Sequence, residues 1–223
     1  MHPMTRYVRA RLSEEGSVRR AAKMQAYMKT SQPFHGVQRP AQKAILREVK
    51  KQFTIPSFEE YKQVITELWS GRCREEMYLA LDVAEAHPRF RVSKVFPFFT
   101  VLLQTAPHWD TVDRICSGLL SPLLREDRSY ERQVFTWSGS DSFWLRRASL
   151  LVHLRQKDQT NVRLLERTIL KLAPDPEFFV RKAIGWVLRE YAETNPRWVR
   201  QFVREHEEEL APLSKREALK HLE

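Results

Sequence analysis

Three segments of the chain align without gaps at a spacing of 35 residues: Trp144-Leu-Arg-Arg-Ala-Ser-Leu-Leu, Phe179-Val-Arg-Lys-Ala-Ile-Gly-Trp and Ser214-Lys-Arg-Glu-Ala-Leu-Lys-His. A small apolar residue recurs within them at Ala148, Ala183 and Ala218, where it would allow neighbouring helices to approach closely. A period in this range is typical of stacked helix pairs, in which each repeat buries a face that it cannot bury alone. The spacing therefore predicts an all-α solenoid of antiparallel helix pairs.

The repeat ahead of these three departs from the pattern at a single position. One further step of 35 residues towards the N-terminus leads from Ala148 to Asp113. The residue four positions before Asp113 is Trp109, which aligns with Trp144 and Phe179. A carboxylate that replaces a small apolar residue, one helical turn from a tryptophan, is the first place to expect chemistry.

The remaining sequence predicts helices joined by short breaks. The chain has only 6 glycines and no long alternation of apolar and polar residues, so β-structure is not expected. We expect Ser57 and Ser142 to cap helices and Pro40, Pro107, Pro176 and Pro196 to open them. The expected helices are 3–13, 18–30, 40–52, 57–70, 72–87, 93–105, 107–120, 127–138, 142–156, 160–172, 176–193, 196–208 and 213–222. We interpret residues 1–223 as one repeat domain, with an N-terminal helical layer over 1–52 and helix pairs over 53–223.

Basic residues follow the second helices of the repeats. Lys and Arg number 38 against 28 Asp and Glu, a formal net charge of +10 that favours a polyanionic partner, either a nucleic acid or an anionic membrane surface. A curved stack of helices would present these side chains to a duplex backbone along its concave face. The alternative is that they pair with neighbouring carboxylates such as Glu177 and Glu190. The basic residues expected to bind DNA are Arg146, Arg147, Arg181, Lys182, Arg189, Lys215 and Arg216.

Several classes of function lack their sequence signals. The chain has no glycine-rich phosphate loop, and its 7 histidines follow no zinc-binding motif, so we expect neither a metal nor an organic cofactor. Cys73 and Cys116 are expected to be reduced thiols inside helices. No apolar segment is long enough to span a membrane, and no signal peptide is evident, so we expect a cytoplasmic protein. Separately, we expect it to be a monomer.

Asp113 is the candidate catalytic residue. Trp109 shares its helix face, and Arg147, one repeat later, is placed to reach the carboxylate and keep it ionised. A purely structural ion pair is the alternative. With Trp186 and Tyr27, however, Trp109 would wall a cleft around the anion. Such a site favours a cationic group or a transition state with developing positive charge, as in cleavage of a glycosidic bond.

Several further stretches form a recognisable set: Met24-Gln-Ala-Tyr-Met-Lys, Phe34-His-Gly-Val, Glu67-Leu-Trp, His108-Trp-Asp-Thr-Val-Asp, Trp144-Leu-Arg-Arg-Ala, Lys182-Ala-Ile-Gly-Trp-Val-Leu-Arg-Glu-Tyr and Leu213-Ser-Lys-Arg-Glu-Ala. Together they resemble the bacterial AlkD-type DNA alkylation repair glycosylases. The resemblance covers nearly the whole chain, and its most specific parts are the last two stretches. The segment Gln32-Pro33-Phe34-His35 is less apolar than the usual family form.

The resemblance implies both a fold and an activity. The fold would be a right-handed superhelix of HEAT-like repeats that cups duplex DNA. The activity would be excision of cationic N3- and N7-alkylated purines by hydrolysis of the N-glycosidic bond, without strand cleavage or base flipping. Asp113 would be the catalytic carboxylate, Trp109 and Trp186 would flank the lesion, and Arg147 and Tyr27 would complete the cleft. Two alternatives are a non-catalytic binder of distorted DNA and an adaptor for an acidic protein segment.

Overall fold

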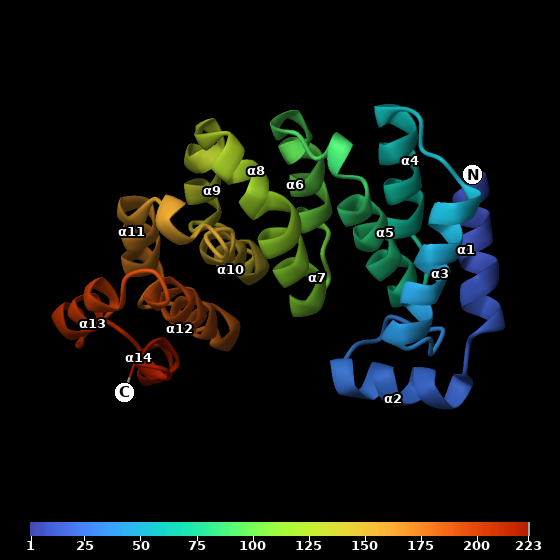
Figure 1. The fold of residues 1–223 in the computed structure, drawn as a ribbon. Helices are drawn as coiled ribbons and strands as arrows, with labels where there is room; N and C mark the ends of the chain where they lie inside the picture. Colours follow the sequence, from blue (N-terminus) through green and yellow to red (C-terminus); the bar gives the residue numbers. More distant parts are fainter. Residues whose placement is uncertain (223) are drawn as a thin grey trace. The chain divides into compact units, whose positions relative to one another are not determined.

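The computed structural model describes residues 1–222, which form helices and turns and contain no β-strand. The prediction of an all-α fold is thus confirmed. Three predicted helix pairs are present, because α9 packs against α10, α11 against α12 and α13 against α14. Figure 1 shows these helices following one another in chain order. Two compact units, residues 1–91 and 92–223, make up the chain.

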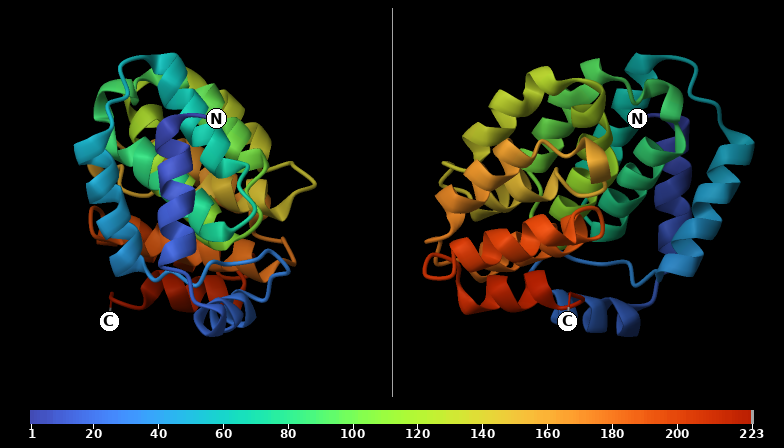
Figure 2. Two further views of the ribbon diagram at one scale, coloured as in Figure 1. Left: turned by 90° about the vertical axis from the view of Figure 1, so that its right-hand side faces the viewer. Right: turned by 60° about the vertical axis from the view of Figure 1, so that its left-hand side comes forward.

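The first unit is built around α1, which contacts α3, α4 and α5. In Figures 1 and 2 the dark blue α1 and the lighter blue α3 lie side by side. The hydroxyl oxygen of Ser57 accepts a hydrogen bond from the Glu60 backbone N–H at 3.1 Å, which confirms the predicted cap. The elements of this unit are α1 (Pro3–Glu14), α2 (Val18–Met28), α3 (Arg39–Gln52), α4 (Phe58–Trp69), α5 (Arg74–Ala86) and a short 3₁₀ turn (Pro88–Phe90).

The second unit continues the series of helices. Its elements are η2 (Ser93–Val95), α6 (Phe96–Gln104), α7 (Trp109–Arg114), the π-helix η3 (Ile115–Leu120), α8 (Ser121–Glu126), η4 (Arg128–Tyr130), α9 (Glu131–Trp137), α10 (Phe143–Leu151), η5 (Lys157–Gln159), α11 (Val162–Leu172), α12 (Phe178–Ala192), α13 (Pro196–Glu205) and α14 (Pro212–Leu219). The division between the units lies after residue 91, and α3 packs on α1 and α5. The predicted N-terminal layer over 1–52 and helix pairs over 53–223 stay predictions. That all 223 residues act as one domain stays a prediction.

The aligned alanines lie where the repeat predicted them. Ala148, Ala183 and Ala218 are completely buried. They lie on α10, α12 and α14, and α12 packs against both of the other two helices. Gly185 brings α14 close, since a Cβ atom at this position would lie 2.7 Å from the Ser214 carbonyl oxygen. Small side chains therefore set the spacing between these helices.

The predicted helix end at Leu120 is wrong. The helix that begins at Trp109 passes through a π-helical segment and continues to Glu126, with Pro122 inside it. An interior proline has no N–H to donate, and its ring crowds the carbonyl one turn earlier. The wider π turn relieves this crowding, and the Ser121 N–H instead bonds the Cys116 carbonyl five residues back.

Smaller differences concern helix ends. Ser142 takes the N-cap position of α10, but its side chain makes no capping hydrogen bond. Pro40 and Pro196 lie in the first turn of their helices as predicted, whereas Pro107 and Pro176 lie two residues before theirs. The predicted helix over 142–156 is shorter, since α10 ends at Leu151 and is followed by turns. None of the helices in the described part of the chain has the length and apolar character needed to cross a membrane.

We predict that Gly185→Ala lowers the thermal unfolding midpoint. Alanine has the higher helix propensity, by about 1 kcal/mol, but its Cβ atom would lie 2.4 Å from the Glu217 Cβ atom. Overpacking of this kind costs about 1–3 kcal/mol. Gly139→Ala is the matched control, because there the nearest atom is the mobile Lys171 Nζ at 3.0 Å. Equal or greater stability of Gly185→Ala would contradict the close packing of α12 on α14.

Candidate active site

Helix α7 carries the first two residues of the candidate site. Trp109 is its first residue, and Asp113 lies one turn later on the same face. Both side chains are half-buried. The π-helix begins two residues after Asp113, and the Ser117 hydroxyl donates a hydrogen bond of 2.8 Å to the Asp113 carbonyl oxygen. This bond fixes the backbone of Asp113 where the helical hydrogen-bond pattern changes.

Arg147 of α10 binds the Asp113 carboxylate through two parallel hydrogen bonds. Its Nε and Nη2 atoms each lie 2.8 Å from one carboxylate oxygen. The Arg147 side chain is only 4% exposed, whereas Asp113 keeps 16% of its side-chain surface in solvent. The predicted contact between the two residues is confirmed. A bidentate pair of this kind holds the carboxylate in one orientation.

The guanidinium of Arg147 is itself held from the other side by α12. Its Nη1 atom donates a 2.5 Å hydrogen bond to the Phe179 carbonyl oxygen. Its central carbon lies 5.9 Å from the Phe179 ring centre and 5.8 Å from that of Trp186. Cations are attracted to aromatic faces at such distances. Residues of three helices, α7, α10 and α12, thus meet at a single arginine.

The environment of Asp113 pulls its pKa in opposite directions. Burial raises the pKa of Asp113 above its usual value, and the hydrogen bonds and charge of Arg147 act against this rise. The charge of Asp110 raises the pKa further, and that of Lys182 lowers it. Without Arg147, burial would therefore oppose ionisation of this carboxyl much more strongly.

Aromatic rings continue from Trp109 along the repeats. The His108 ring lies 6.1 Å from that of Trp109 and 5.6 Å from that of Trp144. Trp144 in turn lies 5.0 Å from Phe179 and 4.3 Å from Phe143. The repeat alignment predicts the positions of Trp144 and Phe179 but not those of His108 and Phe143. His108 directly precedes Trp109, Phe143 directly precedes Trp144, and neither has a counterpart of the same type in every repeat.

Most of the basic residues expected to bind DNA have partners within the chain. Arg146 pairs with Asp175 at 2.6 Å, a carboxylate other than Glu177 or Glu190. Arg181 donates to the Asp175 carbonyl oxygen at 2.7 Å. Arg189 pairs with Glu217, and Lys215 lies 2.9 Å from the Glu207 carbonyl oxygen. Lys182 and Arg216 are exposed. A role in DNA binding stays a prediction for all of these residues.

Tyr27 lies in the first unit, on α2, and 76% of its surface is exposed. It lines a small cavity of about 270 Å³ together with Met24, Phe34 and Tyr78. An aromatic side chain so exposed contributes little to a core. Its predicted place beside Trp109 and Trp186 stays a prediction.

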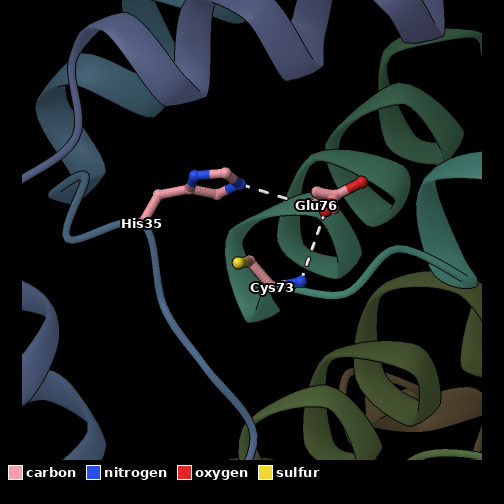
Figure 3. Close-up of side chains that lie close together, drawn as sticks. All are labelled: His35, Cys73 and Glu76. Carbon is pink, nitrogen blue, oxygen red and sulfur yellow. Dashed lines mark hydrogen bonds and ion pairs between the residues drawn. The ribbon is translucent and has the colours of Figure 1, made fainter.

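A second cluster of chemically active side chains lies in the first unit. His35, Cys73 and Glu76 offer ligand atoms within 4.8 Å of one another (Figure 3). Both cysteines of the chain are free thiols, and Cys73 is the N-cap of α5 and not an interior residue as expected. This cluster could not be predicted from the sequence, because 37 residues separate His35 from Cys73 and no zinc-binding spacing is present.

Together the fold and the site define a class: an all-helical repeat protein that holds an arginine-paired carboxylate among aromatic rings. A more specific assignment follows from comparison with known proteins. The chain belongs to the DNA alkylation repair enzyme family, whose model matches residues 8–222. It is similar to a solved structure described as a predicted DNA alkylation repair enzyme from Enterococcus faecalis. That structure is 33% identical, with a TM-score of 0.81 over 93% of this chain and 97% of the other. No curated protein matches the chain.

We predict that Arg147→Ala lowers the free energy of unfolding by about 3 kcal/mol at neutral pH, because it leaves a largely buried carboxylate without its partner. The loss should shrink at mildly acidic pH. A carboxyl whose folded pKa is raised destabilises the fold only while it is ionised, so protonation of Asp113 relieves the penalty. Chemical denaturation at both pH values measures the effect.

Arg189→Ala is the matched control for this measurement. Arg189 and Glu217 form a similar pair, but their side chains are 24% and 19% exposed. More exposed pairs contribute about 0–1 kcal/mol. If Arg147→Ala were no more destabilising than Arg189→Ala, the buried pair would not restrain the three helices.

Proposed function

We propose that the protein is a monofunctional DNA glycosylase that hydrolyses the N-glycosidic bond of cationic N3- and N7-alkylated purines in duplex DNA. Its family supports a role in repair of alkylated DNA. The observation that carries the proposal is the Asp113 carboxylate, fixed by two hydrogen bonds of 2.8 Å to Arg147, with Trp186 against the same guanidinium.

The charge of the substrate explains why a carboxylate and aromatic rings suffice. An N3- or N7-alkylated purine carries a positive charge, which weakens its bond to the sugar. When that bond breaks, its electron pair neutralises the base, so no acid is needed to protonate the leaving group. The deoxyribose is left as a cation that resembles an oxocarbenium ion, as in glycoside hydrolysis.

Asp113 is suited to stabilise that sugar cation. Arg147 holds the carboxylate in place before the reaction begins, so little reorganisation is required as positive charge develops. Water then adds its oxygen to the anomeric carbon and releases a proton. The exposed part of Asp113 is available to orient this water. Trp109 and Trp186 would pack on the sugar and backbone and exclude bulk solvent.

Lesion recognition would then depend on charge and lability more than on hydrogen bonds to the base. Aromatic faces attract cations but do not read the polar edge of a purine. This accords with excision of a lesion that remains stacked in the duplex, without a pocket for an extruded base. The substrates we propose are 3-methyladenine and 7-methylguanine.

The first prediction is that Asp113→Asn lowers release of 7-methylguanine from methylated duplex DNA by at least about 100-fold, the usual effect of removing one preorganised electrostatic group. Asp110→Asn, which changes a carboxylate in the first turn of the same helix, is the control and should remain active. Chromatography of the released bases measures both rates. Salt-sensitive DNA binding without any release would instead support the non-catalytic alternative, and absence of DNA binding would support the adaptor.

A second prediction concerns the two half-buried tryptophans. Trp109→Ala and Trp186→Ala should lower the excision rate far more than the thermal unfolding midpoint, because both rings are partly open to solvent. Trp137→Ala is the control, since Trp137 is only 5% exposed and stacks near Phe96 in the core. Its main effect should be on stability. Unfolding of both site variants would assign these tryptophans to the core.

A third prediction distinguishes basic residues that contact DNA from basic residues that do not. Lys182→Ala should reduce the dependence of DNA affinity on salt by about one counterion, while leaving the fold intact. Arg163→Ala is the control, because Arg163 is also exposed but lies on α11, the first helix of its pair. Equal salt dependence of the two variants would remove Lys182 from the DNA interface.

A further inference from the structure

The cluster of His35, Cys73 and Glu76 combines three different metal-binding side chains. Cys73 caps the N-terminus of α5, and Glu76 lies three residues later on the same helix. His35 approaches from the segment between α2 and α3, with its Nε2 atom turned towards the Glu76 carboxylate (Figure 3). The three ligand atoms lie within 4.8 Å of one another.

Contacts around the cluster hold its members in place. The Glu75 carboxylate accepts hydrogen bonds from the backbone N–H groups of His35, Gly36 and Val37 at 2.8–3.1 Å, which anchors this segment to α5. Gly36 adopts a φ of +83° at this turn, where a Cβ atom would overlap the Ser17 carbonyl. The loop that carries His35 is therefore fixed before any ligand binds.

The bonding of the cluster leaves one atom without a partner. Arg9 Nε donates a hydrogen bond of 2.6 Å to Glu76 Oε2, and the Cys73 backbone N–H donates one of 3.3 Å to Glu76 Oε1, the oxygen nearer to His35. His35 Nε2 is buried and, among the described residues, has no hydrogen-bond partner. Its distance of 3.9 Å from Glu76 Oε1 exceeds hydrogen-bonding range. A buried ring nitrogen without a partner is unfavourable unless something else satisfies it.

We propose that His35, Cys73 and Glu76 bind a zinc ion. A thiolate, an imidazole and a carboxylate are the ligand types that zinc takes in proteins, and the soft sulfur favours zinc over magnesium or calcium. This site is separate from the Asp113 site and does not depend on the proposed glycosylase activity. Its role would be structural, since the ion would tie the 30–38 segment to α5.

The geometry and charge of the cluster suit this ion. Metal–ligand bonds of about 2.0–2.3 Å in a tetrahedron place the ligand atoms about 3.5 Å apart, so side-chain rotation need close the cluster by only about 1 Å. The ion would displace the thiol proton of Cys73 to solvent. The thiolate and the Glu76 carboxylate then balance its two positive charges, and Arg9 keeps its bond to the other carboxylate oxygen. Cys73 and His35 are partly exposed, so water can supply the fourth ligand.

The test is titration of the chelator-treated full-length protein with cobalt(II), a spectroscopic substitute for zinc. We expect one equivalent to bind per chain, with a sulfur-to-cobalt charge-transfer band that zinc abolishes by displacement. Cys73→Ser should lose the band, and His35→Ala should weaken binding at least about tenfold. At a fixed zinc concentration, the unfolding midpoint of the wild type should rise more than that of either variant.

Two control variants make the result specific. Cys116→Ala removes the other, fully buried cysteine, and His206→Ala removes the His206–Glu209 pair, a second place where a histidine and a carboxylate lie together. Both should bind cobalt as the wild type does. Absence of the charge-transfer band in the wild type would overturn the proposal. If Cys73→Ser did not fold, His35→Ala, which changes only a loop side chain, would still test the site. Cobalt affinity in His35→Ala equal to that of the wild type would then overturn the zinc proposal.

Discussion

The second unit depends on one constraint: a carboxylate that lies among helices must be matched by a cation that reaches it. Asp113 occupies a repeat position where Ala148, Ala183 and Ala218 are fully buried. The charge is stabilised because Arg147 extends from α10, one repeat later, and binds both carboxylate oxygens. Arg147 in turn is oriented by the Phe179 carbonyl. Removal of any one member leaves the others with buried, unsatisfied charge or polarity.

An ion pair alone would not distinguish this place as a site. Arg39 binds Asp82 in the same bidentate way, at 2.7 and 2.6 Å, and the Asp82 side chain is only 3% exposed. The Asp82 carboxylate is thus almost inaccessible to solvent, and we interpret its ion pair with Arg39 as stabilising the first unit. Asp113 differs because it keeps some contact with solvent and because Trp186 lies over its arginine. Asp113 is a candidate catalytic residue because its carboxylate is partly exposed to solvent and aromatic rings lie nearby, and not because of the ion pair alone.

The fold could be predicted from the sequence because the 35-residue period shows which positions of successive helices are equivalent. The aligned alanines fix which face of each helix is buried, and the exception at Asp113 points to its partner one repeat later. The continuation of α7 through Pro122 could not be predicted, since a proline normally ends a helix and only the π turn avoids its clash.

Two contacts, the partner of Arg146 and the meeting of His35 with Cys73, could not be predicted from the sequence for the same reason. The partner of Arg146 is Asp175, in the turn before α12, and periodicity says nothing about residues in turns. His35 meets Cys73 only because a loop is held against α5 by Glu75. Contacts of this kind depend on where a loop folds back, which neither spacing nor composition encodes.

We propose that Asp113 offsets positive charge on a sugar as a cationic base departs. Single-turnover excision from two duplexes, one with a single 7-methylguanine and one with neutral hypoxanthine at the same position, measures this effect. The unaltered protein should release the cationic base and retain the neutral one, and Asp113→Asn should abolish the difference. Equal release of both bases by the unaltered protein would rule out this role of Asp113.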